Sequence, residues 1–346
     1  MSPSCPPHLH LRPLRDDDLA AAWAMSQALR WPHRQEDWAD YLRQAQAHGQ
    51  AVAACKDDTL IGTALVWHWG SQQASIGMVI VTPEWQGRGI GRHLLRQLLH
   101  DLDGRNVLLH ATEAGMPLYA SLGFVPSGRC RQYQGIWHPT PTATLPGMNT
   151  GPSADPATGL DTRALRADDI DTLVAQDEAR RGMARGWLLR QLLGTALDDA
   201  TVRQSHGAPP PPSTVRAAVL EDHAGQRHGF GLLRRFGRGW VLGPVLADND
   251  TQLLSLLRWL TRGMDGQFIR IDLAAPVPAF GAPARAMSAP APDTPGAPLL
   301  HAWLQAQGLS LVDETTAMIR LGAPGATPPA AQPATAAYAL LTQAHG

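Results

Sequence analysis

The 346-residue chain contains few charged residues, few cysteines and a single lysine, Lys56. Lys and Arg (29) nearly balance Asp and Glu (30), which leaves no overall positive charge to attract nucleic acid or an anionic membrane. The three cysteines include no C-x-x-C pair, so neither a disulfide framework nor a metal site is expected. No apolar run approaches the roughly 18 residues of a membrane span, and the first residues lack the order of a signal peptide. We therefore expect a cytoplasmic protein without metal, nucleic-acid or membrane partners, its oligomeric state being left open.

Glycine and proline are abundant, with 33 and 29 residues, while hydrophobic residues make up 44% of the chain. This hydrophobic content is too high for a disordered chain, so the excess of glycine and proline indicates long loops and linkers. At roughly 150 residues per domain, the length predicts two domains.

Two segments of the first half recur in the second half in the same order. RPLRDDDL at 12–19 is matched by RALRADDI at 163–170, and LYASLGF at 118–124 by WLQAQGL at 303–309. The first pair predicts a strand, an Asp helix cap and a helix. The second pair predicts a helix closed by a left-handed glycine and followed by a strand. Together they favour two copies of one fold.

The boundaries follow from the repeat and from the Pro/Gly-rich stretches. We expect a first domain at 1–137, a linker at 138–159, a second domain at 160–322 and a loose Pro/Ala-rich tail at 323–346 with a short helix over 336–344. Two Pro-rich stretches account for the greater length of the second copy, 208–213 and 274–298.

Hydrophobic periodicity in the first copy alternates between the strand and helix periods. The expected strands are 7–13, 51–56, 59–69, 74–82, 106–111 and 124–134, and the expected helices are 16–30, 34–48, 89–102 and 115–122. This order predicts a mixed α+β sandwich of the α/β class.

The most specific segment is the turn between strand 74–82 and helix 89–102. It reads Gln86-Gly87-Arg88-Gly89-Ile90-Gly91. A glycine-rich turn that opens a helix directs several unpaired backbone N–H groups and the helix dipole at one point, where a diphosphate fits. The spacing matches neither G-x-G-x-x-G nor a G-K-[ST] nucleotide loop. The alternative is a turn that merely joins strand to helix.

The turn resembles the pyrophosphate loop, Q/R-x-x-G-x-G/A, of the GNAT superfamily of acetyl-CoA-dependent N-acetyltransferases. Val79, Val81 and Pro83 match the V-x-V-x-P end of the family's preceding strand, and residues 117–124 match its Y-x-x-x-G-F element. The resemblance covers about residues 8–135. It implies two tandem GNAT-like acyl-CoA N-acyltransferase domains, with acetyl-CoA as co-substrate and no metal.

The resemblance also implies roles for individual residues. Strand residues Val79, Ile80 and Val81 would bind the pantetheine arm through their backbone. The pyrophosphate would be held by the turn, that is by Gln86, Gly87, Arg88, Gly89, Ile90, Gly91 and Arg92. Tyr119 would protonate the departing thiolate; the alternative is a core aromatic residue on an amphipathic helix.

The acceptor amine needs a general base, and the sequence leaves it open. By their positions in the expected elements, the candidates are Glu84, His110 and Glu113. Each of them can equally be an ordinary polar surface residue. Trp67 and Trp69 can line an acceptor pocket or belong to a half-buried strand.

The second copy departs from the motif. Leu304 stands at the position of Tyr119, and the turn carries Asp248 and Asp250 in place of glycines, which would repel a diphosphate. We expect a degenerate domain that shapes or covers the acceptor site and is not a second catalyst. The expected function is transfer of acetyl from acetyl-CoA to a primary amine of an unidentified small-molecule acceptor, by direct attack in a ternary complex. The alternatives are a non-catalytic acyl-CoA-binding regulatory module and a protein or peptide N-acetyltransferase.

Overall fold

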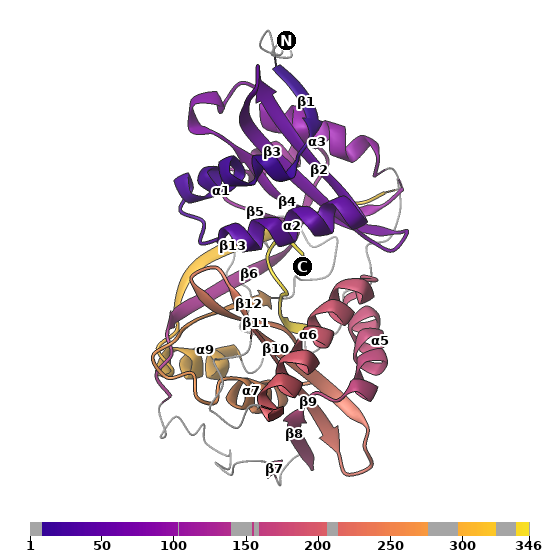
Figure 1. Cartoon of the computed structure of the whole chain (residues 1–346), viewed down its shortest axis with the longest axis vertical. Helices are drawn as coiled ribbons and strands as arrows, with labels where there is room; N and C mark the ends of the chain where they lie inside the picture. Colours follow the sequence, from indigo (N-terminus) through magenta and orange to yellow (C-terminus); the bar gives the residue numbers. More distant parts are fainter. Residues whose placement is uncertain are drawn as a thin grey trace.

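A computed structural model describes residues 9–102, 104–139, 154–155, 159–205, 214–275, 297–322 and 337–345. Two lobes correspond to the two halves of the chain, the first half above and the second below in Figure 1. A single 14-stranded sheet runs through both lobes. The mixed α/β class expected from the sequence is therefore confirmed.

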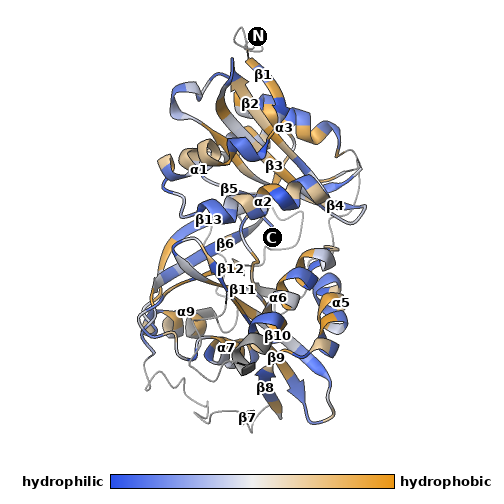
Figure 2. Cartoon of the chain, in the orientation of Figure 1, coloured by the Kyte–Doolittle hydropathy of each residue, from blue (hydrophilic) through white to orange (hydrophobic). Residues whose placement is uncertain are grey.

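The first half has the expected order of elements. Its helices and strands are β1 (Leu9–Pro13), α1 (Leu19–Ala28), α2 (Gln35–His48), β2 (Gly49–Lys56), β3 (Thr59–Trp69), β4 (Gln73–Val81), α3 (Ile90–His100), β5 (Asn106–Ala111), α4 (Met116–Ala120) and β6 (Val125–Ile136). Figure 2 shows apolar residues concentrated on the inner strands, whereas the helices carry mixed surfaces. On α3, one apolar face is buried, namely Ile90, Leu94, Leu95, Leu98 and Leu99, as the helical period predicts.

The second half repeats this order. Its elements are β7 (Ala154–Asp155), β8 (Leu160–Ala164), α5 (Ile170–Arg181), α6 (Gly186–Ser205), β9 (Val215–Asp222), β10 (Arg227–Phe236), β11 (Gly239–Leu246), α7 (Asp250–Leu260), β12 (Phe268–Ala275), α9 (Ala297–Ala306), β13 (Ser310–Arg320) and β14 (Ala337–Ala339). From β8 to β13 each element has a counterpart between β1 and β6, which confirms the internal repeat.

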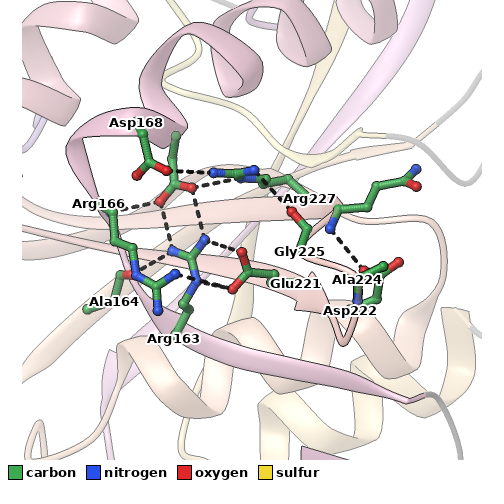
Figure 3. A network of polar contacts seen from close by, with 11 residues as sticks. Arg163, Ala164, Arg166, Asp168, Glu221, Asp222, Ala224, Gly225 and Arg227 are labelled. Carbon is green, nitrogen blue, oxygen red and sulfur yellow. Dashed lines mark hydrogen bonds and ion pairs between the residues drawn. The ribbon is translucent and has the colours of Figure 1, made fainter.

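The first pair of matching segments forms the same ion pair twice. Arg12 donates two hydrogen bonds to Asp18, at 2.6 and 2.8 Å, and Arg163 donates two to Asp169, at 2.8 and 2.9 Å. In the second half Arg163 also binds Glu221, and Arg227 bonds to Asp169 at 2.9 Å (Figure 3). The repeated R-x-L-R-x-D-D sequence therefore fixes the chain between the first strand and the first helix of each half.

The second pair of matching segments forms the same helix end. Gly123 and Gly308 have φ values of +87° and +89°, a conformation that favours glycine. In both, the next residue donates its N–H to a carbonyl five residues earlier: Phe124 to Tyr119 at 3.1 Å and Leu309 to Leu304 at 3.0 Å. These bonds are typical of a Schellman helix end.

The two halves exchange their last long strands. β13 of the second half lies between β5 and β6 of the first half, so that Ala317 faces His110 on one side and Gly128 on the other. β6 in turn lies between β13 and β12, where Tyr133 faces Ile271. Each half thus completes the sheet of the other, and the two strands run between the lobes in Figure 1.

The halves also share a hydrophobic core. One cluster of buried side chains runs from Leu14 in the first half to Leu246 in the second, and Trp187 of α6 stacks on His48 and Trp69 of the first half. The division near residue 137 therefore follows the repeat but does not separate two independent packing units. The structure shows one continuous core shared by the two halves, and not two separable domains.

The tail expected at 323–346 is not loose throughout. Residues 337–339 form β14, which pairs with both β11 and β12, so the short helix expected over 336–344 is wrong. The diverging ends of β11 and β12 offer backbone groups that need partners, and this outweighs the helix propensity of alanine. Most of the linker and of the two Pro-rich stretches lies outside the described residues, but Ala154–Asp155 of the linker forms β7.

Candidate functional site

β4 and β5 diverge part-way along their length. They pair in parallel from Gln73–Asn106 to Ser75–Leu108. Beyond this point β4 bulges against β3, and Met78 has a φ of +53° with its carbonyl accepting a 2.8 Å hydrogen bond from Thr63. The rest of β4 thus presents a strand edge to a gap, where an extended ligand can form strand-like hydrogen bonds. The backbone expected to bind pantetheine, 79–81, lies on this part of β4.

The glycine-rich turn follows directly from this edge. After Val81 the chain makes a short 3-10 turn at Pro83–Trp85, and Gly87 and Gly89 then adopt φ values of +73° and +79°. Gly89 is the residue before α3, so the first N–H groups of this helix have no partners within it. The side chain of Gln86 donates a 3.0 Å hydrogen bond to the Val81 carbonyl and ties the turn to the strand.

The turn is open at Gly87 and closely packed at Gly91. A Cβ added to Gly87 would meet no atom within 4 Å, whereas one added to Gly91 would lie 3.2 Å from Leu118 of α4. The Arg88 guanidinium lies 4.8 Å from the Trp85 ring centre on the exposed side of the turn. Gly87 therefore leaves room for a ligand, and Gly91 lets α4 pack against the start of α3.

Tyr119 lies on α4, which this packing holds beside the turn. Its side chain belongs to the cluster beneath α3 and meets Phe124 edge to face, with ring centres 6.0 Å apart. Burial raises the pKa of Tyr119 to about 12, so the hydroxyl keeps its proton at neutral pH. A buried and protonated tyrosine is compatible both with proton donation to a thiolate and with a purely structural role in the core.

A cleft of about 350 Å³ opens between the two halves. Its floor is formed by β6 and β13 together with the neighbouring strands β5 and β12. The side chains there are mostly polar: His110 and Thr112 on and just after β5, Gln132 and Gln134 on β6, Arg270 on β12, and Asp313 and Thr315 on β13. Its walls are the loop between α1 and α2, the bulge of β4, the turn between β10 and β11 and residues 342–344. The strand exchange and the shared core bring these segments of the two halves together.

Of the three base candidates, only His110 lines this cleft. Its Nδ1 atom is buried and has no hydrogen-bond partner within the described part of the chain. Burial lowers the pKa of His110 to about 4, with the nearby Arg181 acting in the same direction and Asp272 opposing it. The imidazole is therefore neutral at physiological pH. Glu84 and Glu113 are exposed and do not line the cleft.

Comparisons with known proteins agree with this geometry. The model of the acetyltransferase (GNAT) family matches residues 17–124, and a second GNAT domain model matches residues 211–297. The chain belongs to the GNAT superfamily. It contains two GNAT domains.

Three relatives illustrate the relationship. The N-acetyltransferase YitH of Bacillus subtilis, itself uncharacterised, is 26% identical over 200 residues, which cover 58% of this chain and 60% of YitH. A GCN5-related N-acetyltransferase of Sphaerobacter thermophilus is similar in structure, with a TM-score of 0.60 and 14% identity over 93% of this chain and 98% of that one. A tandem GNAT protein from the clavulanic acid biosynthesis pathway has a TM-score of 0.55 and 14% identity, over 92% and 100% of the two chains. The match to YitH thus spans less than two thirds of that protein. At 14% identity, the two solved structures show only that this chain shares their fold.

The second GNAT domain differs at each position equivalent to the site. Leu304 is fully buried in place of Tyr119. The start of α7 is capped by Asn249, which accepts a 3.0 Å bond from the Gln252 N–H, while Asp248 pairs with Arg180 at 2.8 Å. The cap of this helix is therefore Asn249, which stands between the two aspartates.

The gap equivalent to that between β4 and β5 is filled in the second GNAT domain. β11 and β12 pair in parallel only from Trp240–Ile269 to Leu242–Ile271, and β14 then lies between them. A Cβ added to Gly243 would come within 2.0 Å of the Leu340 carbonyl oxygen, so this chain segment passes as close as glycine permits. The protein's own residues occupy the place that is open in the first GNAT domain.

Sequence reasoning did not find most of the cleft. Gln132, Thr315 and Asp313 lie on exchanged strands, and Arg238 lies in the turn between β10 and β11. No spacing in the sequence indicates that these segments meet. Trp67 and Trp69, in contrast, do not line the cleft but are buried against α2 and α6, so the interpretation of them as strand residues in a core applies. Of the helices that the structure describes, none has the length and hydrophobicity to cross a bilayer.

Proposed function

We propose that the first GNAT domain transfers the acetyl group of acetyl-CoA to a primary amine bound in the cleft between the halves. The observation that carries this proposal is the continuity of the site. The glycine turn, the open edge of β4 and the polar cleft follow one another along the same strand, whose bulge residues Gly77 and Met78 line the cleft. A bound thioester and an amine can therefore meet in a single ternary complex.

In the proposed reaction the amine nitrogen attacks the acetyl carbonyl carbon, and the carbon–sulfur bond breaks. The products are an amide and the free thiol of CoA. One proton leaves the amine and one is taken up by the departing thiolate, so the reaction is neutral overall. We assign the first transfer to His110, directly or through a water, and the second to Tyr119.

His110 is preferred to the two carboxylates because of its position and its protonation state. His110 lines the cleft, its buried Nδ1 atom has no hydrogen-bond partner among the described residues, and with a pKa of about 4 the ring is uncharged at neutral pH. A neutral imidazole can accept a hydrogen bond from an incoming amine, whereas an imidazolium cannot. Glu84 and Glu113 remain exposed on the outside of the cleft.

The second GNAT domain acts in this proposal as part of the acceptor site. It supplies Asp313 and Thr315 to the floor and Phe236 and Arg238 to the wall of the cleft. Because β14 fills its own strand gap, we expect one molecule of acetyl-CoA to bind per chain.

The test is release of thiol from acetyl-CoA with a panel of small amines and peptides, together with calorimetry of acetyl-CoA binding. Turnover with a small amine and a stoichiometry of one support the proposal. Binding of acetyl-CoA without turnover on any amine or peptide would identify a regulatory acyl-CoA-binding module. Turnover confined to peptides would identify a protein-modifying enzyme. His110→Gln should lower kcat by about 10²-fold or more and leave acetyl-CoA binding unchanged.

A further inference from the structure

Two arginines from different halves line the exposed part of the cleft. Arg30 lies just after α1, and Arg238 lies in the two-residue turn between β10 and β11. Both also line a neighbouring groove of about 680 Å³ that shares Trp31, Pro32 and His33 with the cleft. Within the part of the chain that the structure describes, neither guanidinium forms an ion pair with a carboxylate.

The backbone at both arginines is held in place by contacts between the halves. Gly237, with a φ of +56°, donates its N–H to the buried Asp37 carboxylate at 2.9 Å, and a Cβ on it would lie 3.0 Å from the Pro32 carbonyl oxygen. Asp37 also receives a 2.7 Å bond from Arg34. The turn that carries Arg238 is thereby fixed against the loop that follows Arg30.

Arg30 occupies an unusual position for its residue type. Its φ is +58°, and the left-handed position after a helix normally carries glycine or asparagine. A side chain there costs about 1–2 kcal/mol of conformational strain. Its N–H bonds to the Gln27 carbonyl at 2.8 Å, an interaction that glycine would make equally well. Folding therefore does not explain the presence of arginine, and strained residues cluster at ligand-binding sites.

The other charges of the cleft do not neutralise the two arginines. Arg270 donates two hydrogen bonds, at 2.9 and 2.6 Å, to the buried carboxylate of Asp272 and is neutralised by it. Asp313 is an exposed carboxylate, but it lies on the floor of the cleft and on β13. In the groove, Glu36 lies near Arg34 and contributes to raising its pKa, after the larger effect of the hydrogen bond to Asp37.

We propose that the acceptor is an amine that also carries an acidic group, a carboxylate or a phosphate, and that Arg30 and Arg238 bind this group while the amine reaches the floor of the cleft. The guanidinium fork matches the oxygens of both anions. Asp313 on the floor provides a counter-charge for the ammonium form of the acceptor before it loses its proton. This inference names the substrate class of the proposed acetyltransferase. It rests on the proposed function for the acetylation of the amine, but not for the binding of the acidic group.

The test compares amines in matched pairs that differ in the acidic group. Glycine is paired with glycinamide, and O-phosphoethanolamine with ethanolamine. Two readouts are used: kcat/KM for thiol release, and the shift in unfolding temperature that each amine causes in the absence of acetyl-CoA. We expect the acidic member of a pair to have at least about tenfold higher kcat/KM, mostly through KM, and a preference that weakens with added salt. The pair that shows the preference distinguishes carboxylate from phosphate.

The variants Arg30→Gln and Arg238→Gln should each remove most of this preference by raising KM for the acidic amines towards that of their neutral partners. Arg190→Gln is the matched control, because Arg190 is an exposed arginine on α6 that does not line the cleft. Equal kcat/KM and equal temperature shifts for acidic and neutral amines in the wild type would overturn the inference. If acidic amines raise the unfolding temperature through Arg30 and Arg238 but no amine is acetylated, the binding inference stands and the proposed activity fails.

Discussion

Gly77 and Ala344 are in contact although they belong to different halves of the chain. A Cβ on Gly77 would lie 2.8 Å from the Ala344 Cβ and 3.1 Å from the Trp67 ring. Gly77 lies at the bulge of β4, and Ala344 follows the segment that fills the strand gap of the second GNAT domain. This contact closes one side of the cleft and joins the two halves.

Gly77→Ala should therefore destabilise the protein by about 1–3 kcal/mol, because the new methyl group overpacks the site. Ala344→Gly removes the nearest atom and should recover part of this loss in the double variant. Urea unfolding of the two single variants and the double variant gives the coupling energy. Strict additivity of the two effects would show that the contact is absent in solution.

A fragment of residues 1–139 should not fold on its own. It lacks β13, so the edges of β5 and β6 that β13 covers would be exposed together with the shared apolar core. We expect an insoluble fragment, or one without a cooperative thermal transition.

Co-expression of this fragment with residues 154–346 is the matched control. The two pieces should purify together in a 1:1 ratio, since each supplies a strand of the other's sheet. A soluble 1–139 fragment that unfolds cooperatively and binds acetyl-CoA would show that the exchange of strands is dispensable.

Gly87→Ala should weaken acetyl-CoA binding by at least about tenfold, or 1.4 kcal/mol. The added methyl group would enter the open space in front of the turn, where the diphosphate is proposed to lie. Gly104→Ala is the control, because Gly104 has a similar φ, +81° against +73°, and also has open space around its Cβ position. Both variants should lose about 1–2 kcal/mol of stability through strain, but calorimetry should show weaker binding in the first alone.

Tyr119→Phe should lower kcat by about 10²–10⁴-fold without changing acetyl-CoA affinity. The tyrosine is buried and its pKa is raised to about 12 by that burial, so it holds a proton to donate throughout the physiological range. The ring contact with Phe124 does not involve the hydroxyl, and we therefore expect the free energy of unfolding to change little. Wild-type turnover would assign Tyr119 to core packing alone.

The ion-pair network of Figure 3 should make stability depend on acid pH. Burial acts to raise the pKa of Asp169, but hydrogen bonds from Arg163, Arg166 and Arg227 outweigh it and lower the pKa to about 2. A lowered pKa in the folded state means that the carboxylate stabilises the protein above its unfolded pKa of about 4, and that this contribution is lost as the pH falls towards 2.

Asp169→Asn should accordingly cost about 2 kcal/mol at pH 7, because the buried carboxylate loses charge-assisted hydrogen bonds from Arg163 and Arg227, which keep Glu221 and Asp168 as partners. The difference from the wild type should shrink between pH 4 and pH 2, as measured by urea unfolding at each pH. Asp168→Asn is the control, since Asp168 is largely exposed and pairs only at the surface with Arg227; it should change stability by less than about 1 kcal/mol. A pH-independent difference for Asp169→Asn would contradict the assignment.

The local features of this protein were determined by its sequence. The strand and helix periods located the elements of the first half to within a few residues. The R-x-L-R-x-D-D segments and the two left-handed glycines predicted the repeat because each motif forms its hydrogen bonds largely within its own few residues. The turn at Gly87 and Gly89 was visible for the same reason: φ values above zero and unpaired helix N–H groups are properties of a short segment.

The cleft was decided only by the tertiary structure. His110 faces it from β5, Asp313 enters from the exchanged β13, and Ala344 reaches the bulge of β4 after β14 has filled another gap. Backbone hydrogen bonds between strands are the same for any sequence, so the order of strands in the sheet leaves no local signal. The order of strands depends instead on which strand edges are left without a hydrogen-bonding partner when the helices have packed on the sheet. That is a property of the whole chain.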